Sequence, residues 1–321
     1  MRTSIRLLSG PFWLTILVIA VAASCVWTSI PVTQAQSSST SFSDLEARAN
    51  AGDSSAQYKL ADFLVHDPHV DSRDFAIALH WLRSSAANHS AAAEFILGYL
   101  YEHGRGMPVD YAQAMENYRA AAKQGNAAAE NNLGGMYQYG RGVAQDMSAA
   151  LQWYQAAAEH GSPVGQYNLA TFYYHGHGTP QDAVQAVKWF RAAAEHGLAA
   201  AEANLAFIYY NGVGVSVDYA AAAHWAKLAA EQGLPHAAAN YGYLCEHGRG
   251  VPIDYVEAYV WYSRAIAEGD KVAVKLRKEI SHLLTPEQTE KANTILAADA
   301  SRSQKPSGVA GDGDVSLIQE P

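Results

Sequence analysis

Cysteine is nearly absent from this chain, which has only Cys25 and Cys245 among its 321 residues. Cys25 lies in an apolar segment near the N-terminus, and if that segment is removed on export, no internal disulfide can form. The chain also lacks the cysteine clusters that hold structural zinc. The packing of apolar residues, which make up 49% of the chain, must therefore hold the fold together.

Basic residues and enzyme motifs are scarce as well. The chain has 22 Lys and Arg against 31 Asp and Glu, for a formal net charge of −9. A nucleic-acid-binding surface needs a basic stripe, so we expect no nucleic-acid partner. Neither His-Glu-x-x-His nor Gly-x-Ser-x-Gly occurs. We expect no catalytic residues and no cofactor, although groups that meet only in space would leave no motif.

The N-terminal segment has the pattern of an export signal. Arg2 and Arg6 precede an apolar run from Phe12 to Trp27, and a polar, serine-rich stretch follows Ala35. A charged start, an apolar middle and a small residue near the end are typical of a secretory signal. We therefore predict a signal peptide over 1–35 and a linker over 36–42.

An uncleaved anchor is an alternative, because the apolar stretch continued to Val32 is nearly long enough to span a bilayer. Residues 12–32 would then tether the protein to the membrane. The residues around Cys25 also weakly resemble a lipoprotein processing site. All three interpretations place residues 40–321 outside the cytoplasm, either periplasmic, secreted or anchored.

Glycine, aspartate and tryptophan recur at a constant spacing of 36 residues. Chance does not produce several parallel series with one period, and a period of this size indicates a stacked array of repeats. The series are Gly104, Gly140, Gly176, Gly212 and Gly248; Gly106, Gly142, Gly178, Gly214 and Gly250; Asp110, Asp146, Asp182, Asp218 and Asp254; Gly125, Gly161, Gly197, Gly233 and Gly269; and Trp153, Trp189, Trp225 and Trp261.

Each unit contains two helical patterns, which we name helix A and helix B. In the clearest unit the pattern predicts helix A over 91–102 and helix B over 111–124. The glycines of the intervening turn, Gly104 and Gly106, suit backbone positions with positive φ. Asp110 is placed to cap helix B, and Gly125 to end it in the left-handed conformation.

These features together resemble the Sel-one-like repeat (SLR), a relative of the tetratricopeptide repeat. The shared pattern is Leu97-Gly98-x-x-Tyr101, a Gly-x-Gly turn, an aspartate, an aromatic residue, Ala-Ala and a glycine. The resemblance implies an all-α, right-handed solenoid with a 36-residue period. A first unit over 53–89 is degraded, and five clear units span 90–125, 126–161, 162–197, 198–233 and 234–269.

The predicted array covers 43–269 and has caps at both ends. A capping box, Ser43-Asp44-Leu45-Glu46, opens a half-unit helix. A C-terminal helical cap spans 270–300, with one helix over 271–284 and a second that begins with the capping box Thr285-Pro286-Glu287-Gln288. Residues 301–321 are rich in Ser, Gly and acidic residues, and we expect them to be disordered.

One helix-A position carries a column of amides that does not look like core. This asparagine column is Asn132, Asn168, Asn204 and Asn240, and seven residues further on the same face carries Tyr139, His175, Asn211 and His247. Helix A lines the concave surface in solenoids of this kind, so these eight residues are our candidate contacts for a peptide or protein partner. The alternative is that each Asn bonds the neighbouring unit and stiffens the stack.

Other polar series admit simpler interpretations. Glu94, Glu130, Gln166 and Glu202 share a helix-A position and are expected either to make the groove edge acidic or to be solvated. The histidines fit turn and helix-end positions, and we predict no metal site; His175-Gly176-His177 is the alternative, but no third ligand is spaced with it. Cys245 replaces a repeated tyrosine and is expected to be a buried small residue.

The resemblance implies an exported scaffold or adaptor that holds a protein or peptide on its concave surface, and we expect a monomer. Two alternatives remain. One is a cell-wall-associated binding protein or hydrolase, by analogy with a secreted branch of the family whose units are stapled by paired cysteines, which this chain lacks. The other is a structural spacer without a groove ligand.

Overall fold

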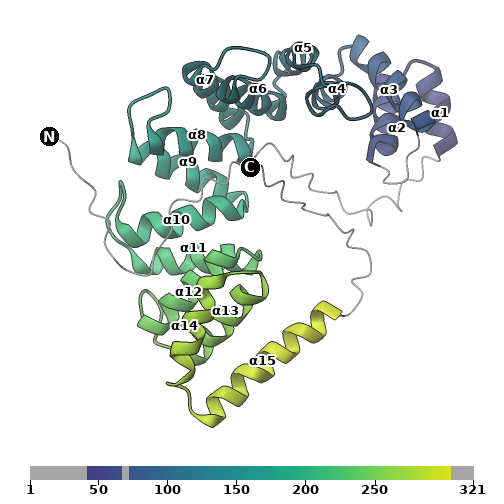
Figure 1. Ribbon diagram of the computed structural model, residues 1–321. Coiled ribbons are helices and arrows are strands. Elements are labelled where there is room, and N and C mark those ends of the chain that lie inside the picture. The colour runs from purple at the N-terminus through teal and green to yellow at the C-terminus, as the bar shows by residue number, and fades with distance from the viewer. Residues whose placement is uncertain (1–41, 67–71, 305–321) are drawn as a thin grey trace.

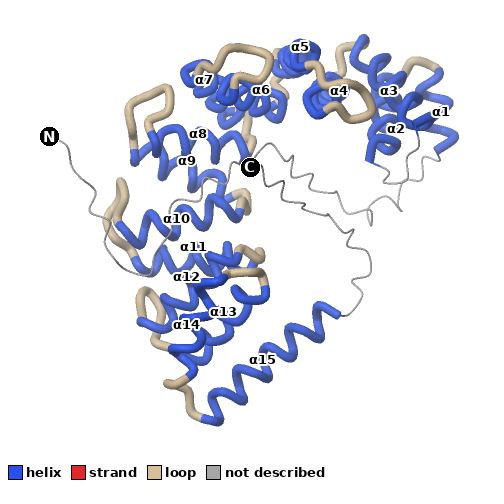
Figure 2. Tube along the Cα trace, in the orientation of Figure 1, coloured by secondary structure: helices blue, strands red, loops and turns tan. Residues whose placement is uncertain are grey.

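The computed structural model describes residues 42–66 and 72–304, and these form fifteen α-helices with no strand among them (Figures 1 and 2). The helices follow one another along a curved array, in which each helix from α1 to α14 packs against its neighbours in the sequence within this range. The all-α solenoid predicted from the 36-residue period is confirmed. The predicted signal segment over 1–35 and the residues from 305 onward lie outside the described part.

Six consecutive helix pairs form the array, between one helix before it and two after it. The lone N-terminal helix is α1 (Phe42–Asn50). The pairs are α2 (Ser54–His66) with α3 (Ser72–Ala87), α4 (Ala91–His103) with α5 (Tyr111–Ala122), α6 (Ala127–Tyr139) with α7 (Met147–Glu159), α8 (Pro163–His175) with α9 (Ala183–Glu195), α10 (Ala199–Asn211) with α11 (Tyr219–Glu231), and α12 (Pro235–His247) with α13 (Tyr255–Ala267). The C-terminal helices are α14 (Lys271–Ser281) and α15 (Pro286–Gln304).

The predicted caps set the helix ends. The Asp110 side chain accepts the backbone N–H groups of Ala112 and Gln113 at the start of α5, and the aspartate 36 residues later in each following unit caps its own helix B. Gly104 ends α4 in the left-handed region with φ of 63°, as predicted. The Asp110 N–H also donates to the Tyr101 carbonyl, which closes the turn between the two helices.

A small residue in helix A allows close contact within a pair: it is glycine in three of the clear units and alanine, Ala170 or Ala206, in the other two. A Cβ added at Gly98 would lie 2.6 Å from Cδ1 of the Tyr118 ring, which belongs to helix B of the same unit. Gly134 and Gly242 face the rings of Tyr154 and Tyr262 in the same way. The missing side chain lets an aromatic ring fill the space between the two helices, so the tyrosines become core residues.

Where the array stops, a charged side chain replaces the small residue at this position. By the 36-residue step, α14 would be the helix A of a seventh unit, and it carries the exposed Lys278 where Gly98 and Gly242 stand. The lysine side chain leaves less room there for an aromatic ring of a helix B than the glycine does. The next helix, α15, packs instead against α13, through Val256, Val260 and Ala292 (Figure 1).

The two predicted capping boxes have different outcomes. At α15, the Thr285 N–H donates to Gln288 Oε1 at 2.9 Å and the Gln288 N–H donates to Thr285 Oγ1 at 3.2 Å, as predicted. At α1, the helix begins at Phe42, one residue before the predicted cap Ser43. The helix α15 continues to Gln304, so residues 301–304 of the predicted disordered tail are helical, and the rest of that tail lies outside the described residues.

Among the helices that the structure describes, none is long and apolar enough to cross a bilayer. The predicted membrane tether over 12–32 lies outside the described residues, so it stays a prediction.

Candidate functional site

Four candidate residues lie exposed at the C-terminal ends of successive A helices. We name Tyr139, His175, Asn211 and His247 the helix-end column. Tyr139 ends α6 with 50% of its side chain exposed, and the other three are also exposed. In Figure 1, α4 lies on the inner side of the curved array and α5 on the outer side. The column is therefore accessible to a partner, and it follows the A helices from unit to unit.

Local contacts hold the members of the column in place. His247 Nδ1 lies 3.0 Å from the Tyr243 carbonyl oxygen, and the two rings stack with centroids 4.0 Å apart. The same arrangement occurs four units earlier, where His103 stacks on Tyr99. Because the carbonyl can only accept, Nδ1 donates this hydrogen bond. Asn211 donates from Nδ2 to the Phe207 carbonyl at 2.9 Å.

The asparagine column lies deeper than the helix-end column. Asn132 and Asn204 are buried, whereas Asn168 and Asn240 are half-buried. Asn132 Nδ2 donates to the Tyr118 hydroxyl at 3.0 Å, Asn204 Nδ2 to the Tyr167 hydroxyl at 3.3 Å, and Asn168 Nδ2 to Asn131 Oδ1 at 2.8 Å. Each acceptor belongs to the preceding unit. These three bonds are the ones that the stiffening alternative predicts, while partner binding by the column stays a prediction.

The glutamate series proves to be neither groove edge nor solvated surface. Glu94, Glu130, Gln166 and Glu202 are all at least 94% buried. Each carboxylate accepts a hydrogen bond from the end of helix B in its own unit: Glu94 from Gln124 at 2.7 Å, Glu130 from His160 at 2.8 Å and Glu202 from Gln232 at 2.8 Å. Burial raises the pKa of Glu94 and Glu202. The prediction of an acidic groove edge was wrong, because these side chains point into the space between helix A and helix B of their own unit.

The Glu130–His160 contact makes a pH-dependent prediction. The hydrogen bond to Glu130 raises the pKa of His160, and the charge of Glu130 raises it further. We expect the pKa of His160 to lie above 6.5 in NMR titration and to fall toward that value in Glu130→Gln. Because the folded-state pKa is the higher one, this contact stabilises the fold fully below about pH 6.5, and the contribution is lost as the pH rises through the folded-state pKa. An unchanged pKa of His160 in Glu130→Gln would contradict this prediction.

Two further sequence predictions can be placed in the structure. Cys245 is buried, and burial raises the pKa of its thiol to about 12, so it is an inert core residue at neutral pH. The rings of His175 and His177 stack with centroids 5.4 Å apart. Within the described residues no group of three His, Cys, Asp or Glu side chains is placed to hold a metal ion.

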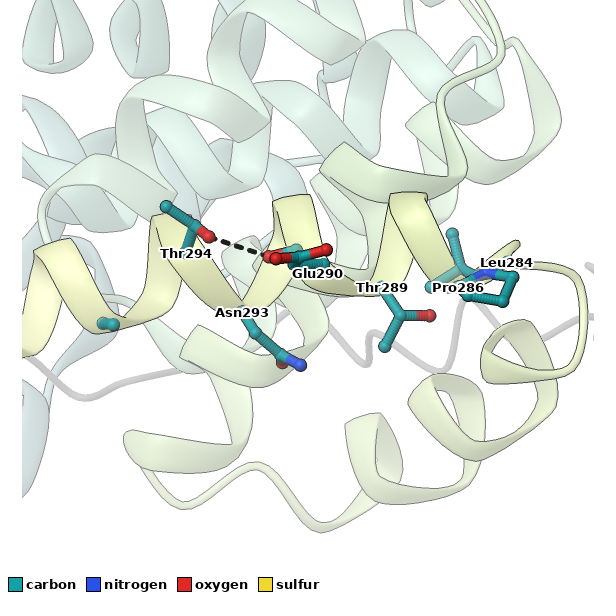
Figure 3. A pocket seen from close by; sticks show the side chains of 7 residues that line it. Leu284, Pro286, Thr289, Glu290, Asn293 and Thr294 are labelled. Carbon is teal, nitrogen blue, oxygen red and sulfur yellow. Dashed lines mark hydrogen bonds between the residues drawn. The ribbon is translucent and has the colours of Figure 1, made fainter.

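Two open hollows lie near the C-terminal helix. One, of about 680 Å³, runs along α15 and is lined by Leu284, Pro286, Thr289, Glu290 and neighbours, whose side chains do not converge (Figure 3). A second, of about 440 Å³, lies between α13 and α15, where Arg264 pairs with Asp299 at 2.7 Å. In the described residues neither hollow brings together a nucleophile and a base.

Arginines that bridge successive units escaped the sequence reasoning. Arg141 Nη1 donates to Glu102 Oε1 at 3.3 Å, and its guanidinium lies over the Tyr139 ring. Arg249, at the same position three units later, lies over the rings of Tyr210, Tyr219 and Tyr243. The signal in the sequence was the middle residue of each Gly-x-Gly turn, which is Arg in three of the five turns.

Comparison with known proteins agrees with this architecture. The sequence matches the Sel1 repeat, the Sel-one-like repeat named above, over 54–90, 91–126, 127–162, 163–198, 199–234 and 235–270. A protective antigen present in uropathogenic Escherichia coli strains, which displays an SLR fold, is 30% identical with a TM-score of 0.70; the alignment covers 85% of this chain and 61% of the antigen.

The structure of a Sel1 repeat protein from Oxalobacter formigenes is 31% identical with a TM-score of 0.61, over 68% of this chain and 89% of that protein. A comparison with curated proteins gives no match. Sel1 repeat proteins generally mediate protein–protein interactions, and the family is generally non-catalytic. With six consecutive repeats over more than half of its length, the chain belongs to the Sel1 repeat family.

Proposed function

We propose that this protein is an exported scaffold that binds a protein or peptide partner on its concave surface. The observation that carries the proposal is the helix-end column, Tyr139, His175, Asn211 and His247, which repeats an exposed aromatic or hydrogen-bonding side chain at one place in four successive units. Burial lowers the pKa of His175, which favours its neutral imidazole. The surface suits neutral contacts such as a peptide backbone and apolar side chains.

The arrangement of the repeats supports an extended partner. The column residues come from α6, α8, α10 and α12, which follow one another along the array. Their side chains are anchored by bonds to their own helices, as for Asn211 and His247, so little conformational entropy is lost when a partner binds. Export rests on the N-terminal pattern of residues 1–35, and the protein would act in the periplasm, in secreted form or on a membrane anchor.

Crosslinked capture from the cell envelope tests the proposal. The bait is the full chain, compared with a variant in which Tyr139, His175, Asn211 and His247 are all alanine. Because the four side chains are exposed, we expect the variant to keep its helical circular dichroism and to lose the partner. A central aromatic contact contributes about 2 kcal/mol or more to binding, so the loss should exceed tenfold.

A matched control lies on the B helices. Glu116, Gln152, Lys188 and His224 also share one repeat position and are exposed, and their replacement by alanine should leave capture unchanged. Capture by the helix-end variant at the level of the intact chain would refute concave binding. If no partner is captured by any bait, the spacer interpretation replaces the scaffold.

A further inference from the structure

The side chain of Arg249 is held in an aromatic box between the fifth and sixth repeats. Arg249 is the middle residue of the last Gly-x-Gly turn, at the start of the 248–254 connection. Its guanidinium carbon lies 5.3 Å from the ring centroid of Tyr210, 5.5 Å from that of Tyr219 and 5.7 Å from that of Tyr243. Nη1 also donates a hydrogen bond to the Tyr210 hydroxyl. Three helices, α10, α11 and α12, thus fix the position of one cation.

The equivalent arginine of the third repeat has an acidic partner. Arg141 donates to Glu102, a residue 39 positions earlier, at 3.3 Å. Arg249 donates to the residue 39 positions earlier as well, but that residue is Tyr210. The same place in the repeat therefore offers a carboxylate in one unit and a neutral hydroxyl in the other. Arg249 is a half-buried cation with no ion pair to any acidic side chain of the described residues.

The nearest acidic residue along α12 is already engaged. Glu246 accepts a hydrogen bond from the Tyr262 hydroxyl at 2.7 Å, on the side of the helix that faces α13. A guanidinium has five N–H donors, and within the described chain only Nη1 of Arg249 bonds a protein acceptor. The site has unused donors, a positive charge and aromatic walls that restrict the side chain to one place.

We propose that Arg249 is the anchoring site for a carboxylate on an acidic segment of the partner. The inference rests on the proposed function and names the chemistry of what the concave surface holds. A pre-positioned guanidinium matches the two oxygens of a carboxylate and loses little rotamer entropy on binding. His247, a member of the helix-end column, stands two residues before Arg249 and stacks on Tyr243, so the two sites are continuous.

The overall charge makes such a site selective. With a formal net charge of −9, the chain repels acidic segments at long range, and generic ionic attraction is weak. An acidic partner segment would therefore bind where a local cation is left unneutralised. Tyr210 at the position of Glu102 creates that condition in this repeat.

Titration of the full chain with defined peptides tests the proposal. The probe is acetyl-Ala-Glu-Ala-Glu-Ala-amide, and the readouts are the Arg249 Nε–H resonance of the intact chain and, in every variant, the backbone N–H resonances of residues 248–250 in ¹H–¹⁵N spectra. We expect a saturable shift with this peptide and none with acetyl-Ala-Gln-Ala-Gln-Ala-amide. Arg249→Gln should weaken binding by about tenfold or more, and Arg249→Lys should fall between it and the intact chain, because lysine keeps the charge without the planar fork.

Arg141→Gln is the matched control, since Arg141 is already neutralised by Glu102, and it should bind as the intact chain does. Equal shifts with the Glu and Gln peptides, unchanged binding by a folded Arg249→Gln, or a shift with inorganic phosphate but not with the Glu peptide would each overturn the proposal. The envelope capture separates the two proposals. If Arg249→Gln still captures the partner that the helix-end variant loses, this inference fails and concave binding stands.

Discussion

Gly214→Ala is expected to destabilise the array by about 3 kcal/mol, through contact with the preceding repeat. Gly214 has a φ of 70°, and a left-handed conformation costs an L-residue about 1–2 kcal/mol. An added Cβ would also lie 2.6 Å from the Ala183 Cβ and 2.9 Å from the Ala183 carbonyl oxygen. These atoms start α9 and cannot move without shifting the helix, and overpacking of this kind adds about 1–3 kcal/mol.

Gly197→Ala separates the two contributions. Gly197 has a φ of 79°, and nothing lies within 4 Å of a Cβ built there. It should lose only the conformational part, about 1–2 kcal/mol. The measurement is urea unfolding followed by circular dichroism, where Gly214→Ala should also broaden or split the transition, because a solenoid is coupled through nearest-neighbour interfaces. Equal losses in the two variants would show that the turn does not press on the preceding repeat.

The period, the turns and the caps followed from the sequence because each depends on local chemistry. A capping aspartate and a left-handed glycine act within four residues of their position, so a series such as Asp110 and Asp146 predicts the same geometry in every unit. The end of the array is also marked by a single local residue, although the sequence analysis did not predict it from that residue. Lys278 at the glycine position is visible in the sequence once the contact between Gly98 and Tyr118 is known.

The burial of the polar series could not be predicted, because it depends on the rotation of helix A within the stack. Glu130 and Asn132 are two residues apart, and a helix turns by about 200° between them. The first bonds the end of its own helix B and the second bonds the preceding repeat, yet both are buried. Neither partner is close in the sequence. The exposure of the helix-end column could be predicted from the sequence, because each of its residues ends a helix A directly before the glycine turn.

Tyr118→Phe is expected to destabilise the protein by about 3 kcal/mol, although it removes a single oxygen. The Tyr118 hydroxyl donates to Glu102 Oε2 at 2.8 Å and accepts from Asn132 Nδ2 at 3.0 Å, and the ring is fully buried. A hydrogen bond to a charged group contributes about 1.5–3 kcal/mol, and a buried amide left without an acceptor costs about 1–3 kcal/mol. Steric strain adds nothing, since the fourth repeat already has Phe190 at this position.

Tyr154→Phe is the reference variant for this loss of stability, and both variants are measured by thermal or urea unfolding. Tyr154 occupies the same place one repeat later, but its hydroxyl donates to the neutral Gln138 at 2.6 Å, and Asn168 bonds Asn131 instead. It should lose about 1 kcal/mol. A larger loss for Tyr118→Phe means that Asn132 couples two repeats and is occupied by the fold. Equal losses would mean that Tyr118 does not hold the Asn132 amide, which could then bond a partner. The asparagine column would then again be a candidate part of the binding surface.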